Sequence, residues 1–300
     1  METSNKTVLI TGAGSGIGLS TSKRLVKEGF TVWAGIRDPK TRNIKKSAAI
    51  QDYANSVGAK VHIVDLDIVK EESCKEAVEK IITKNGKLDI LIHNAAHLYV
   101  GFAEAFTPEQ YMNSLNVNFL GTHILNRVVL PYMRERRDGL LLYIGSGVTA
   151  ITAPFVTPYV VGKTAQAVLA ESLSFELNPF GIESSILMPG LFIDGTSHFE
   201  TAEFPKDSSL DEPYAKLKKD FDAYEQGFRN LFRNENAPIE GVADKILEII
   251  RMPKGSRPLR PTIDYSDYVA EPANATRDAL TKRVYKIMGY SHLMDVNLES

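Results

Sequence analysis

Tyr159 and Lys163 are four residues apart, so on a helix their side chains lie on one face, one turn from each other. An ammonium group close to a phenol favours the phenolate and lowers the pKa of the phenol toward working pH. Ser146 stands thirteen residues before Tyr159 and adds a hydroxyl, which can donate a hydrogen bond to an oxygen that gains negative charge. These three residues predict proton transfer to or from an oxygen, with Tyr159 as the general acid or base.

A tyrosine followed four residues later by a lysine is a weak signal by itself. In a chain with twelve tyrosines about one such pair arises by chance, and Tyr214 and Lys218 form a second one. We favour Tyr159 and Lys163 because Ser146 ends a predicted central strand, and ligands of parallel sheets bind beyond the carboxyl ends of strands. For Tyr214 we expect a solvated helix face.

Three glycines near the start of the chain form a second feature. Gly12, Gly16 and Gly18 follow the apolar run 8–10 with the spacing G-x-x-x-G-x-G. This spacing differs from the dinucleotide fingerprint G-x-G-x-x-G, and it lacks the Gly-Lys-Ser/Thr of a Walker-type phosphate loop. A strand that ends in such a loop and opens a helix still suits a dinucleotide pyrophosphate, because the backbone can approach the anion and the helix N-terminus points N–H groups at it.

In their order along the chain, these motifs resemble the short-chain dehydrogenase/reductase family over residues 6–191. The other motifs of the resemblance are Asp67-Ile68 after the third predicted strand, His93-Asn94-Ala95-Ala96 where the family has Asn-Asn-Ala-Gly, Asn118 in the run 116–121, and Pro189-Gly190 after the sixth strand. The resemblance implies hydride transfer between a nicotinamide cofactor and a carbonyl carbon.

The resemblance also implies a role for each matching residue. Tyr159 would give a proton to the carbonyl oxygen or remove one from the alcohol, and Ser146 would stabilise that oxygen. Lys163 would lower the pKa of Tyr159 and hold the nicotinamide ribose, while Asn118 would position a water that links Lys163 to solvent. The cofactor-binding residues expected besides Tyr159 and Lys163 are Gly12, Ser15, Gly16, Ile17, Gly18, Arg37, Asp67, Ile68, Asn94, Ala95, Pro189, Gly190 and Thr196.

Several positions depart from the family's pattern or allow an alternative. Ala96 replaces a glycine, and we expect it to alter slightly the backbone near the adenosine ribose. Asp194 stands where the family commonly has a threonine that holds the carboxamide, so Thr196 is the candidate for that contact. For Asn118 the alternative role is a local helix hydrogen bond, and the family motif favours Asn118 over Asn116.

The end of the second predicted strand bears on the choice of cofactor. An acidic residue there would bind the adenosine ribose hydroxyls and repel a 2′-phosphate, but Ile36 stands at this place and Arg37 follows. The planar guanidinium of Arg37 suits a phosphate, so we expect NADP. NAD is the alternative, because Asp38 is adjacent and Arg37 could be a solvated turn residue.

The composition excludes several classes of protein. With 43% hydrophobic and 24% charged residues the chain is typical of soluble globular proteins, and a net charge of −2 gives no support for a nucleic-acid partner. Cys74 is the only cysteine, which fits a reducing compartment. No signal-peptide core is seen, and no apolar stretch approaches the roughly 20 residues of a membrane span. We therefore expect a cytoplasmic location.

Metal chemistry is not expected. One cysteine and six scattered histidines do not supply the ligand set of a zinc alcohol dehydrogenase. His93 and His97 are four residues apart but lie at a strand end and in a loop, so we expect each to be hydrogen-bonded inside the fold or to face solvent.

Short β-rich runs alternate with helically periodic segments along the chain. This alternation predicts an α/β fold of the Rossmann type, a doubly wound parallel sheet of about seven strands with helices on both faces. The expected strands are Thr7–Ile10, Thr31–Gly35, Lys60–Val64, Asp89–His93, Leu140–Gly145, Glu183–Met188 and a seventh near Leu259–Ile263. The expected helices run from Gly16 to Glu28, from the capping box at Thr107–Gln110 through Asn118, from Thr157-Pro158 onward, and from Pro238 to about Arg251.

We expect residues 1–300 to form a single domain, with 6–190 as the cofactor and catalytic core. Residues 191–236 would then be a substrate-covering segment, and 237–300 a helix, a strand and a tail that the sequence does not place after Tyr265. In the covering segment five apolar residues recur at helical spacing: Leu217, Phe221, Tyr224, Phe228 and Leu231. We expect most aromatic residues of this segment to pack and a minority to contact the substrate.

The function expected is that of an NADP-dependent carbonyl reductase or alcohol dehydrogenase acting on a fairly apolar small molecule. By the family's habit, the chain would form a homodimer or homotetramer through the helices that contain Asn118 and Tyr159. The alternatives are a non-catalytic NADP(H)-binding regulator, an NAD-dependent alcohol dehydrogenase of the same fold, and an epimerase or dehydratase, for which the chain is short.

Overall fold

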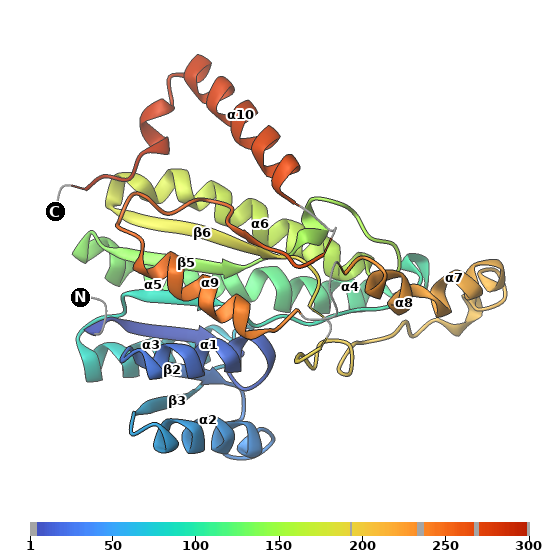
Figure 1. Ribbon diagram of the computed structural model, residues 1–300, viewed down its shortest axis with the longest axis horizontal. Helices are drawn as coiled ribbons and strands as arrows, with labels where there is room; N and C mark the ends of the chain where they lie inside the picture. The colour runs from blue at the N-terminus through green and yellow to red at the C-terminus, as the bar shows by residue number, and fades with distance from the viewer. Residues whose placement is uncertain (1–4, 193, 233–236, 267–269, 299–300) are drawn as a thin grey trace.

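The strands form one sheet in the order β3-β2-β1-β4-β5-β6-β7, and all neighbouring strands are parallel (Figure 1). The computed structural model describes residues 5–192, 194–232, 237–266 and 270–298. The strands are β1 (Thr7–Thr11), β2 (Thr31–Ile36), β3 (Val61–Asp65), β4 (Ile90–His93), β5 (Gly139–Ile144), β6 (Ile182–Pro189) and β7 (Thr262–Ile263). The doubly wound fold is confirmed, and the first six strands agree with the expected ranges to within one residue at each end.

β7 is shorter than expected. The carbonyls of Leu259 and Pro261 accept hydrogen bonds of 2.8 Å from the N–H groups of Ile186 and Met188, so the segment runs along β6 from residue 259 onward. Pro261 has no N–H to donate in return. The strand proper is therefore confined to Thr262–Ile263.

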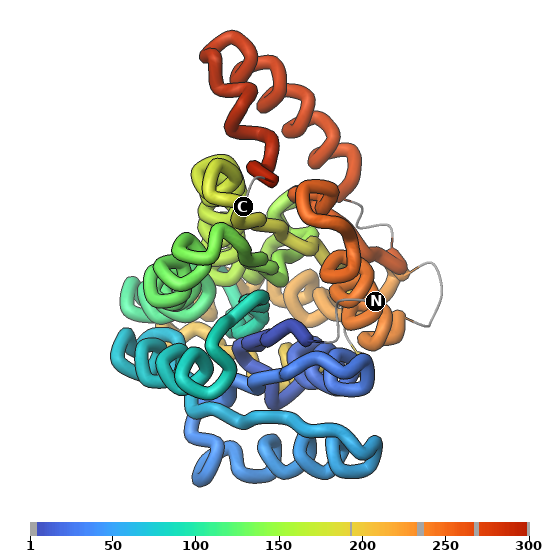
Figure 2. The backbone as a smooth tube through the Cα atoms, turned by 90° about the vertical axis from the view of Figure 1, so that its left-hand side faces the viewer, coloured from blue at the N-terminus to red at the C-terminus, as the bar shows by residue number. Residues whose placement is uncertain are grey.

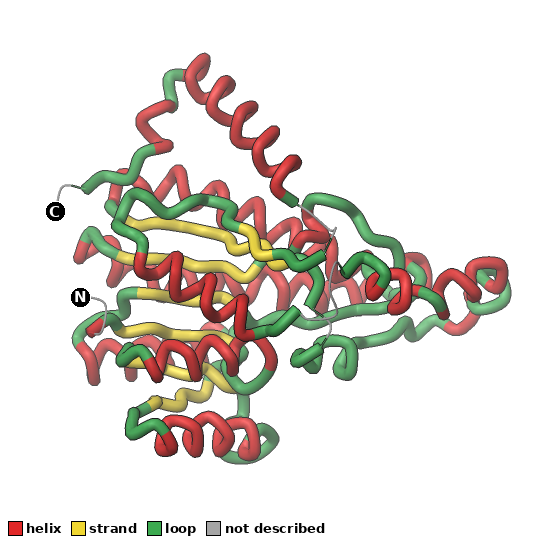
Figure 3. The backbone as a smooth tube through the Cα atoms, in the orientation of Figure 1, coloured by secondary structure: helices red, strands yellow, loops and turns green. Residues whose placement is uncertain are grey.

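Helices cover both faces of the sheet (Figures 2 and 3). Successive strand residues point to opposite faces, so Val8 and Ile10 pack with α1, α2 and α9, whereas Leu9 packs with α3, α5 and α6. The helices are α1 (Gly16–Lys27), α2 (Ile44–Ser56), α3 (Glu71–Asn85), α4 (Pro108–Leu115), α5 (Gly121–Arg136), α6 (Thr157–Leu177), α7 (Lys218–Asp222), α8 (Tyr224–Arg229), α9 (Glu240–Arg251) and α10 (Glu271–Met288).

The helix expected to contain Asn118 is built from three consecutive pieces. Thr107 caps α4, and the reciprocal bonds between Thr107 and Gln110 complete the expected capping box. A π-helical turn at Asn116–Leu120 then leads into α5. Because π-turns interrupt the regular hydrogen-bond ladder, Asn118 lies at an irregular point of an otherwise continuous helix.

The covering segment differs from the single amphipathic helix expected there. The helix is broken at Ala223 into α7 and α8, and Leu217 is 43% exposed. Phe221 packs on the rings of Phe102 and Phe155, with ring centroids 5.3 and 5.5 Å apart. The spacing predicts one continuous helix, but the segment forms two short helices, and Phe221 packs against these two rings.

The tail after Tyr265 contains α10, which the sequence did not place. Gly289, with φ of +77°, ends α10, and a 3-10 turn at Ser291–Met294 follows. Among the described residues, no helix is both long and apolar enough to cross a membrane.

His93 at the end of β4 is buried and hydrogen-bonded inside the fold, as expected. Its Nε2 lies 2.7 Å from Oδ1 of Asn126, and its ring stacks on Tyr143 with 4.7 Å between centroids. Burial lowers the pKa of His93 to about 4. The imidazole is therefore neutral in the folded protein at pH 7.

We predict that acid destabilises the fold through His93. Its pKa is lower in the folded than in the unfolded state, so between about pH 6.5 and 4 the unfolded chain binds more protons and stability falls as pH falls. His93 should account for a loss of about 2 kcal/mol between pH 7 and 5. His93→Asn should reduce this loss in urea unfolding measured at both pH values, whereas the exposed His123→Asn should leave it unchanged. An equal loss in wild type and His93→Asn would contradict the assignment.

Candidate active site

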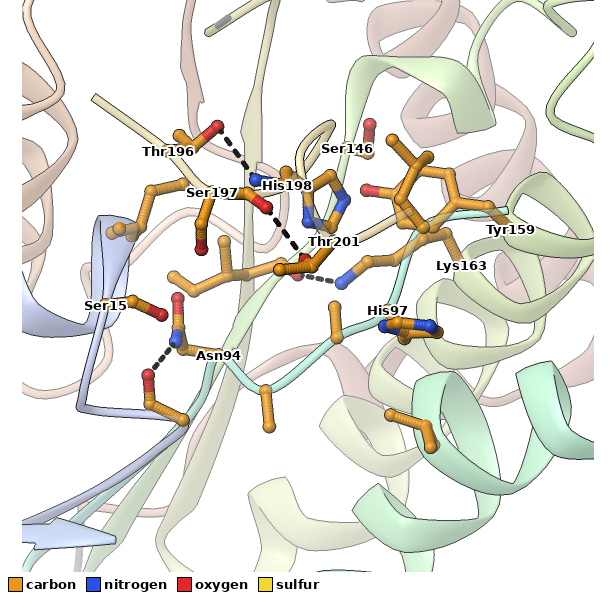
Figure 4. A pocket seen from close by; sticks show the side chains of 18 of the residues that line it. Ser15, Asn94, His97, Ser146, Tyr159, Lys163, Thr196, Ser197, His198 and Thr201 are labelled. Atoms are coloured by element: carbon orange, nitrogen blue, oxygen red, sulfur yellow. Dashed lines mark hydrogen bonds between the residues drawn. The ribbon is translucent and has the colours of Figure 1, made fainter. Parts of the chain in front are cut away.

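A cleft of about 770 Å³ lies at the carboxyl ends of the central strands. It lies beyond the ends of the neighbouring strands β1 and β4. The strand order reverses at this point, and open α/β sheets bind ligands there. Its walls come from the loop 12–17, the ends of β2, β4, β5 and β6, the start of α6 and the covering segment. The cleft joins the glycine motif and the Ser-Tyr-Lys motif in one site (Figure 4).

At Gly12 and Gly18 the glycine loop is packed too closely for a side chain. A Cβ on Gly18 would lie 2.4 Å from the carbonyl oxygen of Gly12 and 2.5 Å from Nδ2 of Asn94. Nδ2 of Asn94 donates to the carbonyls of Thr11 (3.0 Å) and Gly12 (3.2 Å), so Asn94 ties the end of β4 to the loop. Gly18 itself packs beneath the cleft. The residues of the loop region that line it are Gly12, Gly14, Ser15, Gly16 and Ile17.

The loop fits a dinucleotide pyrophosphate. Gly12 and Gly16 have φ of +64° and +51°, values that favour glycine. Ser15 is the N-cap of α1, and its hydroxyl makes no capping hydrogen bond. The unpaired N–H groups at the start of α1 therefore lie beside the cleft together with a hydroxyl, a combination suited to phosphate oxygens.

Positive side chains gather at the β2 end of the cleft. Arg37 lines it as expected, and so do Arg42 and Lys46, which the sequence reasoning missed. These two residues gave no local signal because they reach the cleft only through the packing of α2 and of the loop that precedes it. Asp38 does not line the cleft, and its N–H donates to Oδ1 of Asp65 (3.1 Å). Of the other expected contacts at this half of the cleft, Asp67, Ile68, Asn94 and Ala95 all line it, together with Ala96.

Lys163 is buried at the opposite half of the cleft. Its Nζ donates to the carbonyl of Ile144 (2.7 Å) and to Oε1 of Gln166 (3.1 Å). The side chain is 2% exposed, and this burial lowers the pKa of Lys163 to about 7. α6 begins at Thr157 with Pro158 in its first turn, as expected, so Tyr159 lies one turn before Lys163 at the wall of the cleft.

Ser146 follows β5 and lines the same part of the cleft as Tyr159 (Figure 4). Its Oγ accepts a hydrogen bond of 3.4 Å from the N–H of Val148 and still has a proton to donate. The structure therefore places a hydroxyl donor, a phenol and an amine at one end of the cleft, and their role in proton transfer stays a prediction.

Asn118 is buried and does not line the cleft, whereas Asn116 does. Oδ1 of Asn118 accepts from the N–H of His97 (2.9 Å), and Nδ2 donates to the carbonyl of His97 (2.9 Å) and to Ser114 (3.1 Å). The side chain thus clamps the loop at His97, and only the bond to Ser114 is local to the helix. The water-positioning role implied by the resemblance stays a prediction.

Residues 195–198 of the covering segment lie over the cleft. Thr196 lies above the glycine loop, 3.8 Å from a Cβ placed on Gly16, and His198 packs edge-on against Tyr159 with 5.4 Å between ring centroids. Asp194 is exposed and pairs with Arg229 at 3.4 Å, so Thr196 and not Asp194 lines the cleft, as do Pro189 and Gly190.

Two histidines of the cleft were not identified as site residues from the sequence. Burial lowers the pKa of His198 to about 4. It also lowers the pKa of His97, whose Nε2 is 3.8 Å from Glu203. The only sequence signal for these two histidines was their position after a motif of the family. His97 follows the motif 93–96, and His198 comes after Pro189-Gly190. Within the residues described, no three His, Cys, Asp or Glu side chains are grouped as metal ligands would be.

The wall beyond Tyr159 is largely apolar. It contains Leu98, Val148, Val156, Leu191, Phe199, Tyr224 and Phe228. Four of the eight Phe and Tyr residues of the covering segment line the cleft, namely Phe192, Phe199, Tyr224 and Phe228, which is more than the minority expected, while others, such as Phe221, pack outside it. The second Tyr-Lys pair also lies outside: Tyr214 donates to Glu104 (2.8 Å) and stacks on Phe102, and Lys218 pairs with Asp222 at 2.7 Å. Tyr214 is half-buried and hydrogen-bonded, so the solvated helix face expected there is wrong for this residue.

Comparison with known proteins identifies relatives over most of the chain. The short chain dehydrogenase family model matches residues 6–203. The uncharacterized oxidoreductase YusZ of Bacillus subtilis is 31% identical over 70% of this chain and 75% of its own. Human 17-beta-hydroxysteroid dehydrogenase type 1 is 31% identical over 86% of this chain and 76% of its own. A short-chain dehydrogenase structure from Streptomyces avermitilis aligns with a TM-score of 0.75 and 25% identity, covering 96% of this chain and 99% of that one. The chain therefore belongs to the short-chain dehydrogenase/reductase family, whose members are oxidoreductases that bind nicotinamide cofactors.

Proposed function

We propose that this protein is an NADP(H)-dependent oxidoreductase that interconverts a ketone or aldehyde and the corresponding alcohol. The observation that supports it is one continuous cleft with Ser146, Tyr159 and Lys163 at one end and Arg37, with further cations, at the other. The glycine loop lies between these ends, so a dinucleotide along the cleft would bring its nicotinamide to Tyr159.

When bound, the cofactor supplies or accepts a hydride at the carbonyl carbon. Tyr159 gives its phenolic proton to the carbonyl oxygen as negative charge develops there, and Ser146 Oγ donates a hydrogen bond to the same oxygen. Lys163, whose pKa burial lowers to about 7, can release a proton near neutral pH and so return one to the phenolate of Tyr159. In alcohol oxidation the phenolate accepts the proton instead.

Binding roles follow from the walls of the cleft. Lys163 and Tyr159 hold the nicotinamide ribose, and Thr196 holds the carboxamide. Asn118 acts as a positioning residue through the backbone of His97. The loop residues and the lining residues that follow β3 and β4 hold the pyrophosphate and adenosine, as the resemblance implies.

The choice of NADP rests on charge. Arg37, Arg42 and Lys46 line the cleft at the end of β2, and the adjacent Asp38 does not. Three cations at one end of a cleft attract a 2′-phosphate, whereas the acid at the end of β2, Asp38, does not line the cleft and so does not meet the ribose hydroxyls of NAD. The fold alone does not select the cofactor, since structures of similar fold are known with NADP and with NAD⁺.

A fairly apolar substrate is supported by the side chains beyond Tyr159. Val148, Val156, Phe199, Tyr224 and Phe228 make this wall apolar, and such a wall favours substrates with rings or alkyl chains. Some relatives have names that specify a hydroxysteroid or retinol. We propose a cytoplasmic enzyme that assembles as a dimer or tetramer through α5 and α6.

Tyr159→Phe should lower kcat by about 10²- to 10⁴-fold, the usual contribution of a general acid or base. NADPH binding should remain, because the ring still fills its place. The measurement is the loss of nicotinamide absorbance over a panel of apolar ketones, with NADPH affinity from fluorescence titration. The matched control is Tyr214→Phe in the second Tyr-Lys pair, which should retain full activity. Unchanged turnover in Tyr159→Phe would contradict the assignment, and NADPH binding without turnover by wild type on every carbonyl and alcohol would favour the regulator.

Arg37→Ala should weaken NADPH binding by about 10- to 100-fold and NADH binding little, because a charge-assisted bond to the 2′-phosphate is lost. Arg42→Ala and Lys46→Ala should act in the same direction. Lys45→Ala is the control, since Lys45 is exposed on α2 beside Lys46 and does not line the cleft. Equal losses for NADPH and NADH in Arg37→Ala would rule out the 2′-phosphate contact.

A further inference from the structure

α10 projects from the upper edge of the molecule in both views of the backbone (Figures 1 and 2). One side of it is fastened to the body. Asn274 is buried, Tyr285 packs on Phe175 with 4.7 Å between centroids, and Arg277 pairs with Glu171 at 2.8 Å. After α10 the chain returns to the body, where Nδ2 of Asn178 donates to the carbonyl of Leu293 (2.9 Å). Both ends of α10 are therefore held while its outer side points away from the protein.

The outer side of α10 is apolar. Leu280, Val284 and Ile287 are spaced by four and three residues, so they form one stripe along the helix. They are 55%, 46% and 77% exposed, and Met288 beside them is 54% exposed. A soluble protein rarely leaves such a contiguous stripe in water, so exposure here points to a surface that covers it.

Positive charges border this stripe. Arg283 and Lys286 are exposed on one flank of the stripe, and neither makes an ion pair in the part of the chain that the structure describes. Lys282, also exposed, lies on the opposite side of the helix from the stripe. The two carboxylates of α10 face the body instead: Asp278 pairs with Arg260, and Glu271 accepts a hydrogen bond from Thr262. The outward surface of α10 is therefore apolar and cationic, without a compensating acid of its own helix.

We propose that α10 binds the surface of an anionic lipid bilayer. An apolar stripe bordered by lysine and arginine is the pattern of helices that lie in the interface, with apolar side chains among the acyl chains and cations among the headgroups. The position of α10 at the edge of the molecule lets it meet a flat surface before the body does. A second copy of the chain is disfavoured as the occupant, because a self-paired α10 would bring its unpaired cations together.

The test uses the full-length protein and co-sedimentation with vesicles of phosphatidylcholine, with and without phosphatidylserine. Wild type should bind the vesicles that contain phosphatidylserine, less tightly at high salt because salt screens the attraction. Arg283→Gln and Lys286→Gln should each lower the partition coefficient about fivefold. Val284→Asp combined with Ile287→Asp should lower it about tenfold or more, because apolar burial is lost.

The matched controls lie on α2, at another edge of the molecule. Ile44 is 56% exposed and Lys45 is exposed beside it, so Ile44→Asp and Lys45→Gln repeat the chemical changes away from α10 and should bind vesicles like wild type. Circular dichroism and NADPH binding show that each variant is folded.

Absence of binding to phosphatidylserine vesicles would overturn the proposal, as would binding that the α10 changes leave unaltered. Analytical ultracentrifugation measures the oligomeric state and so tests whether a second copy of the chain covers the stripe instead of a membrane. If Val284→Asp with Ile287→Asp dissociates an oligomer of a wild type that does not bind vesicles, the stripe belongs to a second copy and the proposal fails.

Discussion

The burial of one ammonium group organises the end of the cleft that contains Ser146 and Tyr159. Lys163 is withdrawn from water and bonded to the carbonyl of Ile144 at the end of β5 and to Gln166 on its own helix. Removing a charge from water is unfavourable unless hydrogen bonds replace the lost hydration, so α6 is fixed against the end of β5. This contact fixes Tyr159 one turn away and brings it to Ser146, which follows Ile144 by two residues.

A comparable constraint holds the glycine-loop end of the cleft together. The side chain of Asn94 bonds the carbonyls of Thr11 and Gly12, and Gly18 has no room for a Cβ beside them. β1, β4 and the start of α1 therefore pack closely against one another at the point where the strand order reverses. The cleft lies at this point because neighbouring crossovers leave it in opposite directions.

The covering segment is attached by polar contacts as well as by its aromatic rings. Gln110, fully buried at the cap of α4, donates to the carbonyl of Phe204 (2.8 Å) and accepts from the N–H of Lys206 (3.1 Å). The N–H of Val100 donates to the carbonyl of Glu203 (2.9 Å). A segment distant in sequence thereby forms the wall that faces Tyr159, and it places His198 against the phenol ring.

The sequence alone determined the alternation of strands and helices, the glycine loop and the order Ser146, Tyr159, Lys163, because periodicity and short spacings are local properties of a chain. Tertiary structure decided what depends on contacts between distant segments: Arg42 and Lys46 at the cofactor end, His198 and His97 in the cleft, the break between α7 and α8, and the attachment of Asn118 to the backbone of His97. It also decided the position of α10, whose amphipathic pattern does not reveal which side meets the protein. Local patterns specify elements, but only packing free energy, summed over the whole fold, selects which elements meet.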